Sequence, residues 1–288
     1  MKDIGGTTKI CGLIGNPVGH TKSPAIHNLL AEKTGYDLAY GAFPVPDGSL
    51  TDAIKGAFAL GIFGLNVTVP YKQDVIPCLC DIDPLAEKIG SVNTLVRCGN
   101  GYKGYNTDMP GLLRAFESDG VDIKGEDIVV LGAGGVARAV VMLLEECGAA
   151  GVTIINRNGD RAEELAGSVN SVCGRNFARP LSMGDHGRLP EDRKFIVIQA
   201  TSVGMYPDTE RAVIEDPAFY ERVKVGYDLI FNPRTTRFME LCNKAGARSY
   251  NGSKMLLYQG IIAFEYWTGI RISDELAGEV YEKVLSDG

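Results

Sequence analysis

Histidine, tryptophan and long apolar runs are scarce in this 288-residue chain, which has three histidines and one tryptophan. The histidines, His20, His27 and His186, have no HxxxH spacing. Cys78 and Cys80 stand close together, but no second cysteine pair at metal-ligand spacing accompanies them. We therefore expect no metal site.

No apolar run is long enough for a membrane span, which needs about 18 residues. The longest run, Ala139–Leu144, ends at Glu145, and glycines interrupt the first apolar stretch at Gly12 and Gly15, which argues against a secretory signal. The cysteines number seven, an odd count, and are scattered. We expect a cytoplasmic protein with reduced thiols and no membrane partner.

The chain also lacks a basic stripe. Its 29 Lys+Arg against 36 Asp+Glu give a net charge of −7, whereas a nucleic-acid binder gathers positive charge on one face. Hydrophobic residues make up 45% of the sequence, which is typical of a globular protein, and the length predicts two domains. The partner is then a small molecule rather than a nucleic acid.

In the first third of the chain, short β-branched runs alternate with segments of helical period. This order predicts an α/β domain with a mainly parallel sheet. Ser23 as N-cap, Pro24 at the first helical position and Gly35 after the last turn mark the first helix. The predicted strands are Lys9–Ile14, Leu38–Val45, Gly64–Val69 and Thr94–Arg97, and the predicted helices are Pro24–Lys33 and Leu50–Leu60.

A second βα series begins near residue 127 and predicts a separate Rossmann-type domain. Two helical patterns without an intervening strand close the chain, and we expect them to pack on the first sheet. Ala178–Arg193, rich in Gly and Pro, is expected to be a long loop or a short irregular helix. The predicted elements are strands Ile128–Leu131, Val152–Asn156, Phe195–Ala200 and Val225–Ile230, and helices Gly135–Cys147, Arg161–Val169, Lys254–Trp267 and Ser273–Leu285.

A GxGxxA motif joins the first strand of this second series to its helix. Gly132 permits a tight turn, Gly134 lets backbone N–H groups approach a pyrophosphate, and Ala137 allows close helix–strand packing. Gly135 opens the helix, whose N-terminus favours an anion. The motif in this context predicts a dinucleotide site, the alternative being a merely structural turn.

The end of the next strand discriminates between dinucleotides. NAD-binding domains usually carry an acidic residue there, about 20 residues after the glycines. This chain has Asn156, Arg157 and Asn158 instead, with Arg161 nearby. A guanidinium binds a 2′-phosphate, so NADP is favoured. Asp160 leaves some use of NAD open, and the two arginines could also be ordinary solvated charges.

Three polar clusters lie at predicted strand ends of the first domain: 66–72, 92–94 and 105–108. Ligands of open α/β sheets bind where strands end. Lys72 and Asp108, one base and one acid among amides and hydroxyls, are candidates for proton transfer. The alternative is a surface lysine and a turn aspartate.

The turn at residues 15–24 places Thr21 and Ser23 at a helix N-terminus. Hydroxyls beside unpaired helix N–H groups suit a small carboxylate. Ser23 could equally be only an N-cap.

These motifs together resemble the shikimate dehydrogenase family, in family order over residues 15 to about 264. They are Gly-Asn-Pro and His-Thr-Lys-Ser-Pro within 15–24, Asn-Val-Thr-Val-Pro-Tyr-Lys at 66–72, Val-Asn-Thr at 92–94, Asn-Thr-Asp at 106–108, Gly-Ala-Gly-Gly at 132–135, Asn-Arg at 156–157, Ala-Thr-Ser at 200–202, Tyr-Asp at 227–228 and Asn-Gly-Ser-Lys-Met-Leu with Gln at 251–259.

The resemblance implies NADP-dependent, reversible reduction of 3-dehydroshikimate to shikimate in aromatic amino acid biosynthesis, by a monomer or homodimer. Lys72 matches the catalytic lysine and Asp108 its acidic partner. The residues matching substrate contacts are Thr21, Ser23, Asn66, Thr68, Asn93, Tyr227 and Gln259. Those matching cofactor contacts are Gly132, Gly134, Gly135, Ala137, Asn156, Arg157, Arg161, Thr201, Gly252 and Met255.

The sequence departs from the family pattern at three places. Thr21 replaces the usual serine, Asn158 a frequent threonine, and Ser253-Lys254 a more apolar pair. The first departure leaves the exact substrate open, and the other two leave cofactor preference open. The alternatives are a quinate/shikimate dehydrogenase that also uses NAD or an amino-shikimate relative, and, from another class, a non-catalytic NADPH-binding regulator on the same fold. We expect a substrate domain at 1–108 plus 252–288, an NADP domain at 109–251, and the active site in a cleft between them.

Overall fold

The computed structural model describes residues 4–286, which form two compact units. Unit 1 runs up to Leu112 and resumes at Leu256, and unit 2 is Leu113–Met255. The predicted boundaries fall at 108/109 and 251/252, whereas the compact units divide inside two helices, α4 (Asp108–Ser118) and α9 (Ser253–Thr268). Within the described residues, no helix combines the length and apolarity that a membrane crossing requires.

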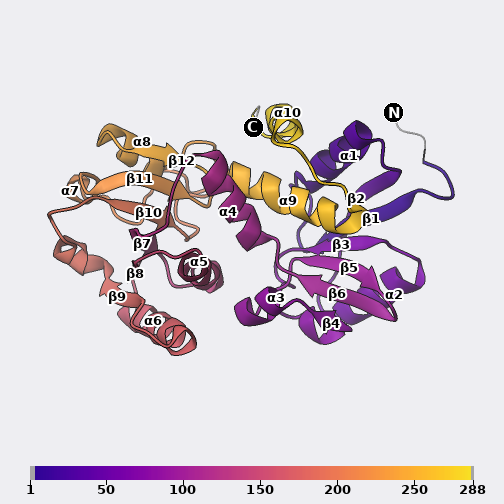
Figure 1. Cartoon of the computed structure of the whole chain (residues 1–288), viewed down its shortest axis with the longest axis horizontal. Coiled ribbons are helices and arrows are strands. Elements are labelled where there is room, and N and C mark those ends of the chain that lie inside the picture. Colours follow the sequence, from indigo (N-terminus) through magenta and orange to yellow (C-terminus); the bar gives the residue numbers. More distant parts are fainter. Residues whose placement is uncertain (1–3, 287–288) are drawn as a thin grey trace. The chain divides into compact units, whose positions relative to one another are not determined.

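Unit 1 is built on a six-stranded sheet of order β2-β1-β3-β5-β6-β4 (Figure 1). The strands β1, β2 and β3 are parallel to one another, while β5 runs antiparallel to β3 and to β6. The sheet is therefore mixed, with a parallel half of the kind predicted and a hairpin appended to it. The strands are β1 (Lys9–Gly15), β2 (Leu38–Pro44), β3 (Gly64–Val67), β4 (Asp81–Ile82), β5 (Thr94–Cys98) and β6 (Gly101–Tyr105).

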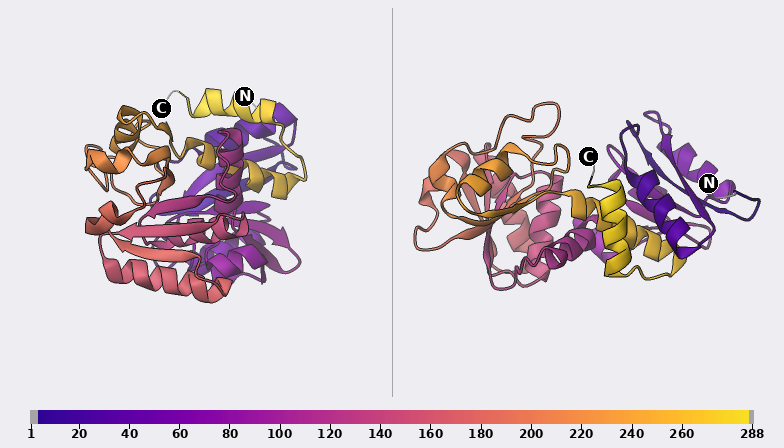
Figure 2. Two further views of the ribbon diagram at one scale, coloured as in Figure 1. Left: turned by 60° about the vertical axis from the view of Figure 1, so that its left-hand side comes forward. Right: turned by 90° about the horizontal axis from the view of Figure 1, so that it is seen from above.

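The helices of unit 1 lie on both faces of this sheet, since the chain moves in opposite directions from β1 to β2 and from β2 to β3 (Figure 2). One core on the sheet packs Leu65, Val67 and Leu95 against α2 and the segment around Tyr71. The helices are α1 (Ser23–Thr34), α2 (Leu50–Ala59), α3 (Pro84–Ile89) and α10 (Asp274–Val284), with a 3-10 turn at Ile76–Cys78.

The start of α1 corrects one prediction. Ser23 is the first residue of the helix rather than its N-cap, a position that Lys22 occupies without a side-chain capping bond. The Ser23 hydroxyl instead accepts a hydrogen bond from the Thr21 hydroxyl at 3.1 Å, and the Ser23 backbone N–H donates to the same Thr21 oxygen at 3.2 Å. At the other end Gly35 adopts φ 69°, as expected for a glycine that ends a helix.

The C-terminal helix α9 packs on the first sheet, as predicted. The Trp267 indole Nε1 donates to the Leu95 carbonyl oxygen of β5 at 3.0 Å. At Gly64 of β3, a Cβ would lie 2.2 Å from the same indole nitrogen, so only glycine lets the tryptophan lie this close to the strand.

Unit 2 has a fully parallel six-stranded sheet of order β12-β11-β10-β7-β8-β9. This is the doubly wound order of a Rossmann-type domain, which confirms the predicted fold class. The strands are β7 (Asp127–Leu131), β8 (Gly151–Asn156), β9 (Ala178–Ser182), β10 (Phe195–Gln199), β11 (Val223–Asp228) and β12 (Arg248–Tyr250), and the helices are α5 (Gly135–Glu146), α6 (Gly159–Cys173), α7 (Pro217–Tyr220) and α8 (Arg237–Lys244).

One prediction in this unit is partly wrong. Of the segment Ala178–Arg193, expected to be a long loop or a short irregular helix, Met183–Arg188 does form a 3-10 helix, but Ala178–Ser182 pairs with β8 as the strand β9. Gly184, Gly187 and Pro190, the residues that indicate a loop, all lie after β9. Pro180 is tolerated within β9 because this is an edge strand, where a proline costs no ladder hydrogen bond on the open side.

Candidate active site

Polar side chains gather at one edge of the unit 1 sheet. The strands β1, β3 and β6 end at this edge, and the antiparallel strand β5 begins there. The segments next to these strand ends carry six of the predicted site residues, and Asn66 lies in β3 itself. The six are Thr21, Ser23, Thr68, Lys72, Asn93 and Asp108. Because strand polarity fixes which ends meet, the three polar clusters of the sequence belong to one site.

Lys72 and Asp108 form an ion pair at this edge, with 2.7 Å between the lysine Nζ and the aspartate Oδ2. Their side chains are 30% and 19% exposed, so the pair reaches solvent without being a free surface contact. Asp108 is the first residue of α4, where the helix dipole favours a carboxylate. The Asn106 side chain accepts from the Asp108 backbone N–H at 3.1 Å and fixes that helix start.

The amide of Asn66 is held in one orientation by three hydrogen bonds. Its Oδ1 accepts from the Tyr40 hydroxyl at 2.7 Å, and its Nδ2 donates to the Thr94 hydroxyl at 3.0 Å and to the Asn93 carbonyl oxygen at 3.2 Å. Both amide hydrogens are used, so a ligand could meet Asn66 only at Oδ1, as an acceptor.

Asn93 can only donate to a ligand, whereas Asn66 can only accept. Its Oδ1 accepts from the Thr107 backbone N–H at 2.8 Å and from the hydroxyls of Thr107 and Thr94, both at 3.1 Å. With its oxygen committed to these fully buried threonines, Asn93 can offer a ligand only its amide N–H groups. The two amides thus provide one acceptor and one donor side by side.

Thr21 and Ser23 lie together at the start of α1, as predicted. The Thr21 hydroxyl donates to the Ser23 hydroxyl and accepts from the Ser23 backbone N–H. The two hydroxyls therefore lie beside each other at this helix N-terminus, where a small anion is favoured.

Thr68 and Gln259 complete the predicted substrate set in unit 1. Thr68 follows β3 and packs its methyl group so closely on Gly15 that a Cβ there would lie 2.3 Å away. Gln259 is half-buried on α9, and its Nε2 donates to the Leu256 carbonyl oxygen at 2.9 Å. Its Oε1 is the group with which it can meet a ligand donor.

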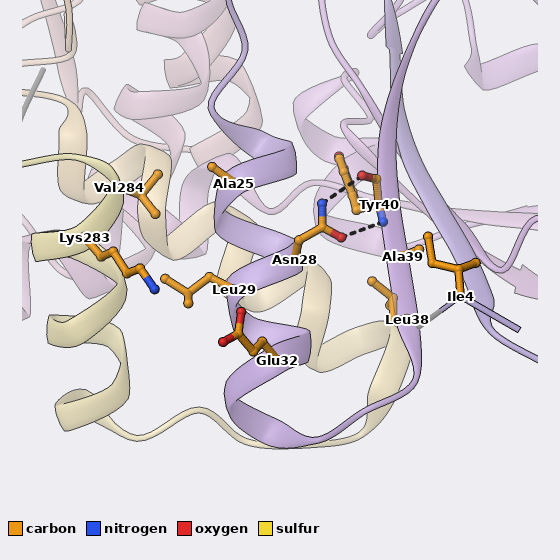
Figure 3. A pocket seen from close by; sticks show the side chains of 10 residues that line it. All are labelled: Ile4, Ala25, Asn28, Leu29, Glu32, Leu38, Ala39, Tyr40, Lys283 and Val284. Carbon is orange, nitrogen blue, oxygen red and sulfur yellow. Dashed lines mark hydrogen bonds between the residues drawn. The ribbon is translucent and has the colours of Figure 1, made fainter. Parts of the chain in front are cut away.

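Tyr40 was not identified from the sequence, although it orients Asn66. The Asn28 side chain brackets the Tyr40 backbone, accepting from its N–H at 2.9 Å and donating to its C=O at 3.0 Å (Figure 3). His27 stacks on the Tyr40 ring with centroids 4.2 Å apart and is fully buried. The sequence carries no signal for this role, because an aromatic residue in a strand resembles an ordinary core residue.

The same face of α1 borders a hollow of about 530 Å³. Figure 3 shows that it lies between α1, β2 and α10 and that its walls are mostly apolar side chains such as Leu29, Leu38 and Val284. None of the predicted catalytic, substrate or cofactor residues lines it.

In unit 2, the β7–α5 turn has the conformation that a dinucleotide requires. Gly132 adopts φ 114°, and a Cβ there would lie 2.8 Å from the Thr201 methyl group. Gly134 and Gly135 are exposed, and a Cβ at either position would meet only open space, so a pyrophosphate can approach the helix N-terminus. Ala137 is fully buried, as close helix–strand packing needs.

The end of β8 carries the predicted phosphate-binding residues. Asn156 is its last residue, and its Nδ2 donates to the Asn158 carbonyl oxygen at 2.9 Å. Asn158 caps α6 by accepting from the Arg161 N–H at 3.3 Å. Arg157 and Arg161 are exposed, and neither forms an ion pair within residues 4–286. Their guanidinium groups are free to bind a phosphate.

The four remaining predicted residues of unit 2 each lie in a different environment. Thr201 follows β10, and its hydroxyl accepts from the Val203 N–H at 3.1 Å. Gly252 lies so close to the main chain that a Cβ would be 2.2 Å from the Leu229 carbonyl oxygen. Met255 is half-buried in the first turn of α9. Tyr227 is fully buried, and its hydroxyl donates to Asp119 Oδ2 at 3.1 Å.

Asp228, noted only as part of a motif, is a fully buried carboxylate that holds the loops after β10 and β11. It accepts from the Thr236 hydroxyl at 2.6 Å, the Ile230 N–H at 2.9 Å and the Gln199 amide at 3.3 Å. Burial outweighs these bonds and raises the pKa of Asp228 to about 6. Its role is to order the segments that carry Thr201 and Gly252.

Unit 2 carries a glycine-rich turn and, at the end of β8, residues suited to a phosphate. Unit 1 carries a Lys–Asp pair among oriented amides. These features are typical of a nicotinamide-dependent oxidoreductase of the two-unit α/β class. Family models match the chain at 13–95 (shikimate dehydrogenase substrate binding domain), 114–180 (shikimate / quinate 5-dehydrogenase) and 252–276 (shikimate 5'-dehydrogenase C-terminal domain). The chain belongs to the shikimate dehydrogenase family, as its motifs indicated.

Relatives agree over nearly the whole length. The shikimate dehydrogenase (NADP(+)) of Moorella thermoacetica is 41% identical over 272 residues, 93% of this chain and 91% of that protein. A crystal structure of a shikimate dehydrogenase in complex with NADP+ matches with TM-score 0.86 and 35% identity, covering 98% of each chain. The Listeria monocytogenes shikimate 5-dehydrogenase in complex with shikimate and NAD matches with TM-score 0.88 and 32% identity, covering 97% of this chain and 98% of that one.

Proposed function

We propose that this protein is an NADP-dependent shikimate dehydrogenase, which reversibly reduces 3-dehydroshikimate to shikimate in aromatic amino acid biosynthesis. The observation that carries the proposal is the Lys72–Asp108 ion pair, set at the same sheet edge as the oriented amides of Asn66 and Asn93. We assign substrate binding to 1–108 plus 252–288 and cofactor binding to 109–251, in a cytoplasmic monomer or homodimer.

The residues of the β7–α5 and β8–α6 turns fit NADP. Gly132, Gly134 and Gly135 leave room for the pyrophosphate at the α5 N-terminus, and Arg157 and Arg161 offer guanidinium groups for the 2′-phosphate. Thr201, Gly252 and Met255 are assigned to the same ligand. When bound, NADPH supplies the hydride that reduces the substrate carbonyl.

Lys72 handles the proton of this reaction. As the carbonyl carbon is reduced, its oxygen gains negative charge, and the Lys72 ammonium Nζ donates the proton that makes it a hydroxyl. Asp108, with its Oδ2 at 2.7 Å from the Lys72 Nζ, holds the ammonium group in place before the transfer. In the oxidative direction the neutral Lys72 amine takes the hydroxyl proton back.

The other residues fix the substrate. Ser23 and Thr21 at the α1 N-terminus suit its carboxylate, Asn66 accepts from a ring hydroxyl, and Asn93 donates to a ring oxygen. We assign Thr68, Tyr227 and Gln259 to the same substrate.

Initial rates with shikimate and quinate, each against NADP and NAD, test the proposal. We expect shikimate with NADP to give the highest kcat/KM. Absence of oxidation of either acid with either cofactor would instead favour the non-catalytic NADPH-binding regulator, which the paired Lys72 and Asp108 argue against.

We predict that shikimate is preferred to quinate. Quinate has an extra hydroxyl on the carbon that bears the carboxylate, and the Thr21 methyl narrows the space beside that carbon. The Thr21 hydroxyl is held by two bonds to Ser23, so it does not rotate freely to accept the new group. A buried hydroxyl without a partner costs about 1–3 kcal/mol, which corresponds to at least about a fivefold bias in kcat/KM.

The variant Thr21→Ser removes only the methyl group and should raise kcat/KM for quinate while leaving that for shikimate within about twofold. Comparable kcat/KM values for both acids in the unmodified enzyme would place it among the dual-substrate relatives.

A further inference from the structure

Two of the seven free cysteines, Cys80 and Cys98, have their sulfur atoms 2.9 Å apart. Cys80 is exposed and Cys98 is half-buried, so a small reagent reaches the pair from solvent. In unit 1, away from the sheet edge that carries Lys72, Cys98 is the last residue of β5 and Cys80 directly precedes β4.

The fold brings these thiols together across a glycine. Strand β6 lies between β5 and β4, and its first residue, Gly101, pairs with Cys98. The Cys80 N–H donates to the carbonyl oxygen of the next residue of β6, Tyr102, at 3.0 Å. A Cβ at Gly101 would lie 3.1 Å from the Cys80 Cβ and 3.4 Å from its Sγ, so the missing side chain leaves the space in which the two sulfurs meet.

The other cysteines differ in environment. Cys11 and Cys242 are fully buried, and burial raises the pKa of each thiol to about 12. Cys78, two residues before Cys80, is half-buried, and its sulfur lies 3.6 Å from the Thr51 hydroxyl. Among residues 4–286 no cluster of three or more His, Cys, Asp or Glu side chains is suited to a metal ion, so a metal does not account for the pair.

We propose that Cys80 and Cys98 are a modification site at which the chain forms an intramolecular disulfide by exchange with a low-molecular-weight disulfide. A disulfide needs its sulfurs at about 2.05 Å, so the pair has to close by less than ~1 Å. This proposal does not depend on the dehydrogenase activity.

The exchange balances in two steps. The Cys80 thiolate attacks one sulfur of the reagent RSSR, which forms a Cys80–SR mixed disulfide and releases RS⁻. The Cys98 thiolate then attacks the Cys80 sulfur, which forms the Cys80–Cys98 bond and releases the second RS⁻. The protein loses two electrons and two protons, and the reagent becomes two RSH.

Desolvation, which is only partial at this exposed residue, and the adjacent Cys98 thiol raise the pKa of the Cys80 thiol to about 11. The thiolate is the attacking species, so the exchange should accelerate as the pH rises from 7 to 9, about tenfold per pH unit. The Cys80–Cys98 disulfide joins positions that are 18 residues apart, and the loop that it closes contains α3 and Asn93.

The test treats the reduced full-length chain with oxidised glutathione at pH 8, removes the reagent and maps disulfides by peptide mass spectrometry without reduction. We expect a Cys80–Cys98 cross-linked peptide, the loss of two of the seven thiols and no retained glutathione. Dithiothreitol should restore all seven thiols.

Two variants distinguish the pair from general thiol reactivity. Cys78→Ser, the matched control, should still form the Cys80–Cys98 cross-link. Cys80→Ser should form no cross-link and instead retain one glutathione on Cys98. A stable glutathione adduct on Cys80 of the unmodified chain, a cross-link between any other cysteines, or no thiol loss would overturn the proposal.

Discussion

Lys72 and Lys103 each hold a carboxylate on the sheet of unit 1, at 2.7 Å from Asp108 and 2.8 Å from Asp81. Only Lys72 lies at the edge with the oriented amides. We expect Lys72→Ala to lower kcat at least about 100-fold while KM for shikimate stays within about threefold, because a proton-transfer group acts mainly in the transition state.

The matched variant Lys103→Ala removes an ion pair of the same kind and should leave kcat unchanged. Steady-state kinetics of both variants decide the matter. Near-normal kcat in Lys72→Ala would remove Lys72 from the mechanism.

Tyr40 and Tyr102 are both buried tyrosines of this sheet with bonded hydroxyls, but Tyr40 donates to Asn66 and Tyr102 to the Ile62 carbonyl oxygen. Tyr40→Phe frees the Asn66 Oδ1 and lets its amide shift away from the ligand. We expect KM for shikimate to rise about fivefold with kcat nearly unchanged, the equivalent of one neutral hydrogen bond.

Tyr102→Phe serves as the control and should lower thermal stability without changing KM. If both variants lose stability and neither changes KM, Tyr40 supports the fold only.

The sequence predicts Lys72 and Asp108 as site residues because polar residues stand out at the ends of apolar strands, and the family resemblance adds Asn66 and Asn93. It could not identify Tyr40, because an aromatic residue in a strand has the pattern of an ordinary core residue. The partner it orients is 26 positions away, and only the pairing of β1 with both β2 and β3 brings the two together.

At the scale of elements, the turn between β8 and α6 should determine cofactor choice. Arg157 is exposed and forms no ion pair among residues 4–286, so its guanidinium is free for a 2′-phosphate. We expect NADP to be preferred to NAD by at least about tenfold in kcat/KM, since a charge-assisted contact is worth at least about 1.4 kcal/mol.

Arg157→Ala should remove most of this preference by raising KM for NADP while leaving KM for NAD unchanged. Arg188→Ala, at an exposed arginine of the same unit, should change neither. Equal efficiency with both cofactors in the unmodified enzyme would contradict this interpretation of Asn156 and Arg157.

Helices and strands with a clear hydrophobic periodicity could be predicted from the sequence, whereas short or irregular strands could not. The order of strands and helices around Gly132 followed from the βα alternation. Strand β4 has two residues and β9 contains a proline, so neither has a period to detect. Both are held by long-range pairing, with β6 and β8, rather than by their own residues.

For the whole molecule, the two units should respond to acid in opposite directions. In unit 1, burial lowers the pKa of His27 to about 3, an effect that its interaction with Asn66 offsets only in part. The unfolded chain therefore binds this proton more readily, and stability decreases as the pH falls below about 6.5. In unit 2, the raised pKa of Asp228 means that the folded state holds its proton more tightly, so stability increases as the pH falls from about 6 to about 4.

Trp267, the single tryptophan, lies in unit 1, so its fluorescence follows the unfolding of that unit in urea. Hydrogen exchange of peptides from β10 and β11 follows unit 2. We expect the urea concentration at the midpoint of the tryptophan fluorescence change to be lower at pH 5 than at pH 7. The variant His27→Leu should make this difference smaller. Protection of the β10 and β11 amides from hydrogen exchange should increase as the pH falls from 7 to 5, except in the variant Asp228→Asn. If the stability of both units changed in the same direction, the opposite effects assigned to His27 and Asp228 would be contradicted.

The two hydrogen bonds between the Asn28 side chain and the Tyr40 backbone also affect whether this chain aggregates at high concentration. Strand β2 is the outer strand of its sheet, and such a strand presents free N–H and C=O groups to which a foreign strand can add. The Asn28 side chain occupies both groups of Tyr40 as a neighbouring peptide would (Figure 3). The variant Asn28→Ala should therefore keep the fold but aggregate more readily, which a concentration-dependent rise in light scattering would show. The Asn28 amide thus protects the edge strand β2 against pairing with strands of other molecules.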